Sequence, residues 1–133
     1  MSYMLDTNAC IHYLNNADSP IRRWMELLHP SDVLVCSVVK AELYYGACRS
    51  SRKSEMFAAL ERFLNPLKSL PFNDDSARVY GTIRSDLSSK GTPIGPNDLM
   101  IASIALAHNV TLVTHNTREF GRVDGLRLED WQV

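Results

Sequence analysis

A short apolar strand that ends at a carboxylate constrains this chain more than any other stretch. Tyr3-Met4-Leu5 is followed at once by Asp6, and the sequence then becomes helical over residues 9–15. This order predicts a buried strand that presents Asp6 at its carboxyl end, just ahead of a helix. Ligands of parallel α/β sheets bind at that edge of the sheet. The search for a functional site therefore starts with other polar residues at strand ends.

Short apolar runs alternate with helical patterns along the rest of the chain. Residues 33–36 are typical of a strand buried on both faces. Residues 110–114 indicate a further strand, and 70–72 and 127–129 indicate shorter ones. Between them, apolar residues recur at three- and four-residue spacing, which predicts helices at 20–29, 38–48, 56–66, 74–87 and 96–107. This alternation predicts an α/β fold, a three-layer α/β/α sandwich around a mostly parallel sheet of about four or five strands.

Two local details are part of this prediction. Ser37 directly precedes the helix at 38–48, so we expect its hydroxyl to cap that helix. Residues 115–119 are polar and short, and we expect them to form a loop.

Length and composition narrow the class of protein. At 133 residues we expect a single domain, 1–133, with its own core. The formal net charge of −1 argues against bulk positive charge as the means of holding nucleic acid, but leaves room for a local basic rim. No apolar run approaches the roughly 20 residues that cross a bilayer, and the N-terminus does not resemble a signal peptide. Cys10, Cys36 and Cys48 lack CxxC spacing, so we expect buried thiols in a reducing cytoplasm.

Three carboxylates occupy positions that call for an explanation. Asp6 ends the first strand, Glu42 interrupts an apolar helix face, and Asp98 opens the most hydrophobic helix. A carboxylate beside core residues is unfavourable without a cation or hydrogen-bond donors. A divalent ion at the sheet edge would meet this need, and oxygen ligands with open positions suit Mg²⁺ or Mn²⁺. The chemistry that fits such a site is hydrolysis of a phosphodiester bond.

Each acid also has a plainer role. Asp98 lies in the first turn of a helix, where the dipole favours a negative charge by about 0.3–1 kcal/mol. Asp6 could cap the helix that follows it, and Glu42 could be solvated at a helix edge. Four nearby polar residues could either hydrogen-bond these carboxylates or serve in ordinary turns and caps: Thr7, Asn8, Ser37 and Thr114.

Five stretches span almost the whole chain: MLDTN (4–8), CSVVKAELYYGA (36–47), GTPIGPNDLMIASIA (91–105), LVTHNTREF (112–120) and GLRLEDW (125–131). Their order and spacing resemble the PIN-domain ribonucleases, most closely the VapC toxins of bacterial type II toxin–antitoxin pairs. The resemblance implies metal-dependent cleavage of RNA, with Mg²⁺ or Mn²⁺ as cofactor and Asp6, Glu42 and Asp98 as the acidic core. The last two stretches are similar to the branch that cuts initiator transfer RNA in its anticodon loop.

The family often supplies a fourth acid in the loop after the last long strand. Asn116 stands where many relatives have aspartate, and Glu119 is the nearest acid. We therefore predict Glu119 as the fourth metal-binding carboxylate, acting directly or through water, with Asn116 beside it. The alternative is an exposed glutamate paired with Arg118 or Arg122. The number of metal ions and any role of His12 or His115 stay open.

The resemblance also implies partners. It implies a homodimer and a cognate antitoxin whose C-terminal segment crosses and occludes the active site. Tyr44 and Tyr45, adjacent on one short helix, indicate either an interface or core packing. Six residues could form a basic rim that holds RNA phosphates, although each alone is more often a solvated charge: Arg49, Arg52, Lys53, Arg84, Lys90 and Arg118.

Two other functions compete with a nuclease. A phosphatase with an aspartate nucleophile also has an aspartate at the end of its first strand. Such enzymes usually carry a D-x-D pair, and Asn8 occupies the second position here. The other alternative is a non-catalytic PIN module that binds RNA or protein without cutting. The presence of Asp6, Glu42 and Asp98 together favours an enzyme.

Overall fold

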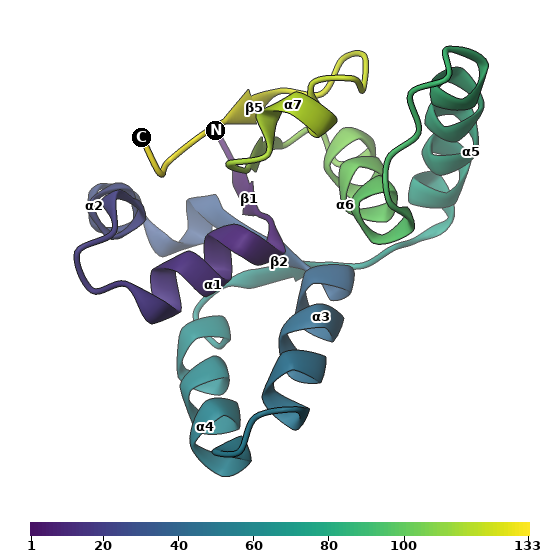
Figure 1. Ribbon diagram of the computed structural model, residues 1–133. Coiled ribbons are helices and arrows are strands. Elements are labelled where there is room, and N and C mark those ends of the chain that lie inside the picture. The colour runs from purple at the N-terminus through teal and green to yellow at the C-terminus, as the bar shows by residue number, and fades with distance from the viewer.

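Five parallel strands form the central sheet, in the order β3-β2-β1-β4-β5. The computed structural model describes all residues from 1 to 133, and Figure 1 shows their arrangement. The strands are β1 (Tyr3–Leu5), β2 (Val33–Cys36), β3 (Lys68–Leu70), β4 (Thr111–Val113) and β5 (Leu128–Glu129). The strand that ends at Asp6 is thus the central one. The predicted α/β/α sandwich with a parallel sheet is confirmed.

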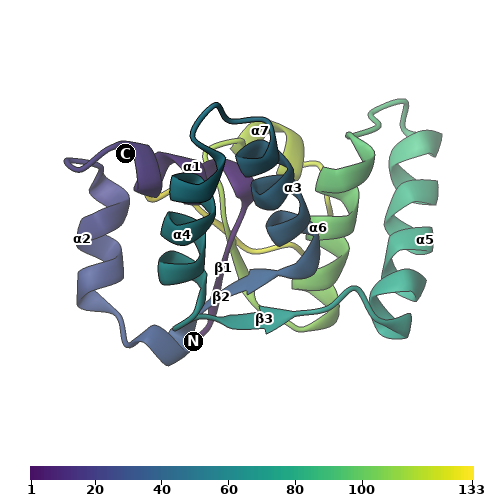
Figure 2. The same ribbon diagram turned by 90° about the horizontal axis from the view of Figure 1, so that it is seen from below.

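Helices cover both faces of the sheet (Figures 1 and 2). Crossovers between neighbouring parallel strands are right-handed, so helices on the way from β1 to β3 lie on one face, and helices on the way back lie on the other. The first set is α1 (Thr7–Asn15), α2 (Pro20–Leu27), α3 (Ser37–Cys48) and α4 (Lys53–Leu64). The second set is α5 (Asp74–Ser89), α6 (Pro96–Ala107) and the short α7 (Thr117–Phe120). A single 3₁₀ turn, Pro30–Asp32, precedes β2.

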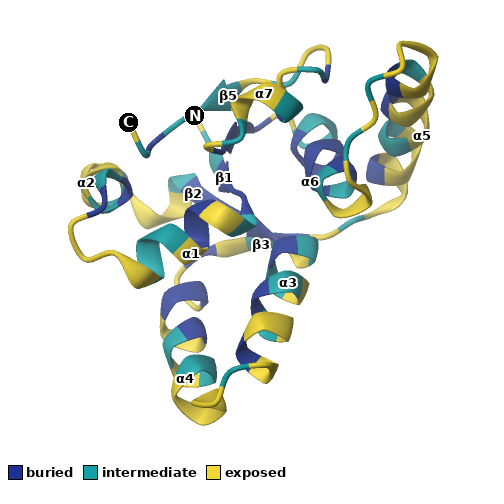
Figure 3. Ribbon diagram, in the orientation of Figure 1, coloured by how far each residue is buried: buried dark blue, intermediate teal, exposed yellow.

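The core lies along β1, β2, β4 and α6. All four residues of β2 and all three of β4 are buried, as expected for strands covered on both faces. Helix α6 packs against α5 as well as against β4 and α3, which explains why it is apolar almost all round. Figure 3 shows buried residues concentrated on these inner elements and exposed residues on the outer sides of α4 and α5.

Capping residues set the starts of α2 and α5. Ser19 caps α2 ahead of Pro20, and its hydroxyl accepts a hydrogen bond from the backbone N–H of Ile21. Asn73 caps α5 by accepting from the backbone N–H of Ser76. Residues adjacent in the sequence therefore determine where these two helices begin, through local hydrogen bonds.

Three local predictions were wrong. Ser37 does not cap α3: β2 runs directly into the helix, Cys36 takes the capping position, and the Ser37 hydroxyl donates to the Leu70 carbonyl at 3.4 Å. Strand β3 begins at Lys68 and stops at Leu70, because it pairs with β2 along one edge only and Pro71 has no N–H to extend the pairing. Residues 117–119 of the expected loop, together with Phe120, form the short helix α7.

Two of the three cysteines are buried and one is exposed. Cys10 and Cys36 are buried thiols, whereas Cys48 is exposed, contrary to the prediction, because it lies at the outer end of α3.

Tyr44 packs within the molecule, stacked on Phe57, and Tyr45 is 64% exposed. A dimer contact through Tyr45 stays a prediction. None of the helices is both long enough and apolar enough to cross a membrane.

Candidate active site

Asp6 is both a strand end and a helix cap. Its backbone N–H donates to the Val113 carbonyl at 3.0 Å, which continues the pairing of β1 with β4. Its carboxylate accepts from the backbone N–H of Ala9 at 2.7 Å, at the start of α1. The side chain is only 4% exposed. The capping role suggested by the sequence is therefore real, and it coexists with a position at the carboxyl edge of the sheet.

Burial raises the pKa of Asp6, and the hydrogen bonds from the Thr114 side chain and the Ala9 N–H oppose that rise. The negative charges of Glu42 and Asp130 raise this pKa further. Asp6 thus lies within the electrostatic range of two other acids that are remote in sequence.

Glu42 is held by two side chains from other helices. The Thr7 hydroxyl on α1 donates to one carboxylate oxygen at 2.5 Å, and the Asn97 amide on α6 donates to the other at 3.4 Å. Glu42 is half-buried. The starts of α1 and α6 therefore meet one side chain of α3 at this edge, and Glu42 is not a freely solvated residue.

Burial is the main cause that raises the pKa of Asp98 to about 6. The rest of this pKa shift comes from three negative charges, those of Glu42, Asp6 and Glu119. Negative charges raise the pKa of a carboxyl group when they lie near it. The charges that act on Asp98 thus come from the other acids singled out in the sequence: Asp6 after β1, Glu42 on α3 and Glu119 on α7.

The four acids lack basic partners. None of the ion pairs in the protein involves Asp6, Glu42, Asp98 or Glu119. No three His, Cys, Asp or Glu side chains lie close enough together to hold a metal ion directly. Mutually repelling carboxylates without a cation still suit a divalent ion that keeps part of its water shell, as Mg²⁺ commonly does. This donor set fits such an ion.

The loop after β4 builds the remaining wall of the site. The Asn116 amide donates to the Glu119 carboxylate at 3.0 Å, and the Asn116 backbone N–H donates to the Thr114 hydroxyl at 3.0 Å. Glu119 makes no contact with Arg118 or Arg122 of the kind predicted as an alternative. Asn116 therefore orients the fourth acid.

Two polar residues of this site were missed in the sequence. Asn97 bonds Glu42, and Asp130 affects the pKa of Asp6. Asp130 directly follows β5, so the rule that drew attention to Asp6 would also have found it. Asn97 carried no signal, because a residue in the first turn of a helix has many uses. Asn8, in contrast, is exposed and bonds none of the carboxylates.

The six basic residues of the predicted rim are scattered. Arg52 pairs with Glu55, Lys90 with Asp86 and Asp124, and Arg84 donates to the Tyr80 hydroxyl. Arg49 follows the end of α3, Arg52 precedes α4 and Lys53 is its first residue. The end of α3 is about 16 Å from its start at Ser37. Arg118 is on α7 beside Glu119. Of the six, Arg118 alone is next to one of the four acids in the chain.

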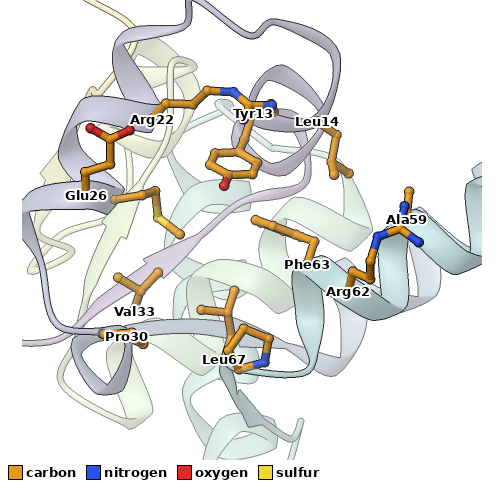
Figure 4. A pocket seen from close by; sticks show the side chains of 12 residues that line it. Tyr13, Leu14, Arg22, Glu26, Pro30, Val33, Ala59, Arg62, Phe63 and Leu67 are labelled. Carbon is orange, nitrogen blue, oxygen red and sulfur yellow. The ribbon is translucent and has the colours of Figure 1, made fainter.

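The largest hollow lies away from these acids, among α1, α2 and α4. It has a volume of about 620 Å³, and most of its lining residues are apolar. Figure 4 shows Tyr13, Phe63 and Leu67 around it, with Arg22, Glu26 and Arg62 towards its rim. The Arg22 guanidinium lies 4.3 Å from the centre of the Tyr13 ring. An apolar hollow with charged edges suits a polypeptide segment better than a phosphate.

We expect Asp98→Asn to stabilise the metal-free protein at neutral pH. Because the pKa of Asp98 is about 6 in the folded protein and ordinarily 3.8, its ionisation opposes folding. The favourable contribution of this group is complete below pH 3.8 and is lost as the pH rises through 6. Asparagine avoids that loss. Since the side chain is half-buried, solvent screening reduces the gain to about 1 kcal/mol.

Urea unfolding of both proteins at pH 7.5 and at pH 4 measures this effect. The free energy of unfolding of the variant should exceed that of the parent at the higher pH, and the difference should shrink at the lower one. An equal difference at both pH values would mean that the charge of Asp98 is not its cause.

Comparison with known proteins identifies the family of this chain. The PIN domain model matches residues 3–126. The chain is 42% identical over 132 residues to ribonuclease VapC2 of Rickettsia felis, and 40% identical over 131 residues to the tRNA(fMet)-specific endonuclease VapC of Salmonella typhimurium, each match covering 98% of both chains.

Solved structures show the same fold. The VapBC2 structure from Rickettsia felis, bound to a promoter DNA fragment, matches with a TM-score of 0.93 at 41% identity, covering 98% of this chain and 99% of that one. The VapBC-1 structure from nontypeable Haemophilus influenzae matches with a TM-score of 0.92 at 36% identity over 100% of both chains. This chain belongs to the PIN-domain family and, within it, to the VapC ribonucleases.

Proposed function

We propose that this protein is the toxin of a toxin–antitoxin pair and a Mg²⁺- or Mn²⁺-dependent endoribonuclease that cuts initiator transfer RNA in its anticodon loop. The observation that carries the proposal is the convergence of four acids. The charges of Asp6, Glu42 and Glu119 act on the pKa of Asp98. None of these four acids has a basic partner. Relatives named tRNA(fMet)-specific endonuclease support the choice of RNA.

The protein's own contribution is to hold oxygen ligands in place. Thr7 and Asn97 fix the two oxygens of Glu42, while Ala9 and Thr114 orient Asp6. A bound divalent ion would supply a more acidic water as nucleophile and positive charge beside the phosphate. Because these groups are positioned before substrate binds, little reorganisation is needed during the reaction.

Cleavage of a short RNA tests this proposal. The purified protein is incubated with the anticodon stem–loop of initiator transfer RNA, with Mg²⁺ or Mn²⁺ and then with excess chelator. We expect cleavage in the loop that stops on chelation and returns when the metal is restored. Cleavage that persists in chelator would contradict the metal requirement, and cleavage outside the loop would contradict the proposed target.

The same assay separates the two alternatives. A binding module would retain the RNA without cutting it in either metal. A phosphatase would release phosphate from a monoester and form a phospho-aspartate at Asp6. Residue 8, where that chemistry needs its second acid, is an exposed asparagine.

The partner that we propose is an antitoxin, as in the VapBC complexes of known structure. The hollow among α1, α2 and α4 has the apolar lining that an amphipathic segment of such a partner needs. Trp24 and Leu27 on α2 add exposed apolar surface, 40% and 81% exposed. Another segment of the antitoxin would reach the acidic site, where one of its arginines would meet the unpaired carboxylates.

We expect Ala59→Arg to weaken antitoxin binding by at least about ten-fold, because a long charged side chain would fill the apolar contact and would have to be desolvated there. Ala59 lines the hollow, whereas Ala58, next to it on α4, is exposed and outside it. Ala58→Arg is therefore the matched control. Calorimetric titration with the antitoxin measures both, and equal affinities would place the contact elsewhere. RNA cleavage by the free toxin should not change in either variant.

A further inference from the structure

A polar hollow beside the carboxylates has no role in the function described so far. Its volume is about 480 Å³, within the range of about 300–1,000 Å³ that is usual for small-ligand sites. Helix α1 and the turn after it form one wall, the loop after β4 a second, and the C-terminal segment a third. The lining residues are Asn8, Ile11, His12, Asn16, His115, Asn116 and Gln132.

The hollow and the acidic site share their walls. Asn8 is two residues after Asp6 on α1. Asn116, on the other side, is the residue that orients Glu119. A nucleotide chain whose phosphate reaches the carboxylates therefore has a neighbouring nucleotide at this hollow.

The lining is rich in amides and contains no fixed charge. None of its seven residues is Asp, Glu, Lys or Arg, so no fixed positive charge is present to bind a phosphate. No group of three metal-binding side chains lies there either. Carboxamides both donate and accept hydrogen bonds, which is the pattern presented by the edges of nucleobases. The side chains of Asn8 and Gln132 form no hydrogen bond within the protein, and Asn16 uses only its amide nitrogen, in a bond to the His12 carbonyl. These amides are free to bind a ligand.

An exposed apolar side chain and an imidazole ring also line the hollow. Ile11 is 41% exposed, an unusual position for a large apolar side chain unless something packs on it. The imidazole of His115 is held through its Nδ1 by the Asp130 carboxylate at 2.8 Å, and Asp130 is only 17% exposed. The ring is thus oriented from one edge, while its face is accessible. Imidazole and aliphatic surfaces are both suited to the face of a base.

We propose that this hollow binds the base of a nucleotide that flanks the phosphate to be cut, and so determines sequence preference. The amides of Asn16 and Gln132 contact the edge of the base, and Ile11 and His115 contact its face. Asp130 is a positioning residue that holds the His115 ring. The inference rests on the proposed function, since it assumes that RNA is cut at the neighbouring carboxylates.

Abasic substrates test this inference. Three stem–loop RNAs are compared: the intact one, one lacking the base on the 5′ side of the cut, and one lacking the base on the 3′ side. The parent should cut one abasic RNA about ten-fold or more slowly in kcat/KM than the intact RNA, the size expected for losing one stacked base. Asn16→Ala and Gln132→Ala should cut the intact RNA more slowly, but that same abasic RNA as fast as the parent does.

Asn15→Ala is the matched control. Asn15 is exposed, adjacent to Asn16 and outside this hollow, so its variant should behave like the parent on all three RNAs. The inference is overturned if the defects of Asn16→Ala and Gln132→Ala multiply with both abasic losses, or if the parent cuts all three RNAs equally well. Absence of metal-dependent cleavage by the parent would instead defeat the proposed function, and this inference with it.

Discussion

Asp6→Asn is expected to lower the rate of RNA cleavage by about 100- to 1,000-fold, the range seen when one preorganised electrostatic group is lost, while the protein stays folded. The asparagine side-chain oxygen still accepts the Ala9 N–H that Asp6 accepts at 2.7 Å, so the cap of α1 survives. The negative charge that would hold the metal ion is removed. The substitution therefore separates the two roles that Asp6 combines.

Single-turnover cleavage of the anticodon stem–loop at saturating metal measures this effect, with thermal unfolding as the check on the fold. Asp18→Asn is the control, because Asp18 is an exposed acid in the turn after α1 and forms no ion pair. We expect it to cut at the parent's rate. If Asp6→Asn also stays within about five-fold of the parent, well below the loss expected for such a group, Asp6 serves as a cap and does not hold the ion.

Trp131→Ala is expected to destabilise the protein by about 3–5 kcal/mol, the range found for removing a large buried aromatic side chain. Trp131 is 1% exposed although it is the third residue from the end of the chain. Its ring stacks on Trp24 with centres 5.4 Å apart, lies 5.3 Å from the Tyr3 ring, and its indole N–H donates to Glu129 at 2.9 Å. The C-terminal segment is thereby anchored against β1 and α2.

Urea unfolding gives the free energy of the Trp131 variant, and Trp24→Ala serves for comparison. Trp24 contributes to the same stack but is 40% exposed, so its loss should cost about 1 kcal/mol, the order of a single aromatic pair. The Trp131 variant should also lose the base preference proposed above, since Asp130 and Gln132 flank the anchor. A loss below about 1 kcal/mol would show that the segment is not part of the cooperative unit.

Much of the fold could be predicted because its signals are local. Val33–Cys36 is apolar at every position, which is usual for a short strand covered on both faces, and Ser19-Pro20 carries a complete helix start. The errors occurred where a tertiary contact overrides the local pattern. Ser37 bonds Leu70 in place of capping its own helix, and the polar Lys68 and Ser69 become a strand because β2 offers them partners.

The candidate site likewise has features that follow from local sequence patterns and features that depend on tertiary contacts. The sequence by itself determined the α/β class, the position of Asp6 at a strand end and the family of the chain, since these depend on short patterns and their order. Only the tertiary structure decided that Thr7 meets Glu42 across 35 positions and that Asn97 meets it across 55. It also decided that the loop after β4 and the C-terminal segment enclose one polar hollow beside the acids. Such contacts arise from the packing of α1, α3 and α6 at one sheet edge, and packing depends on the whole core rather than on any neighbouring residues.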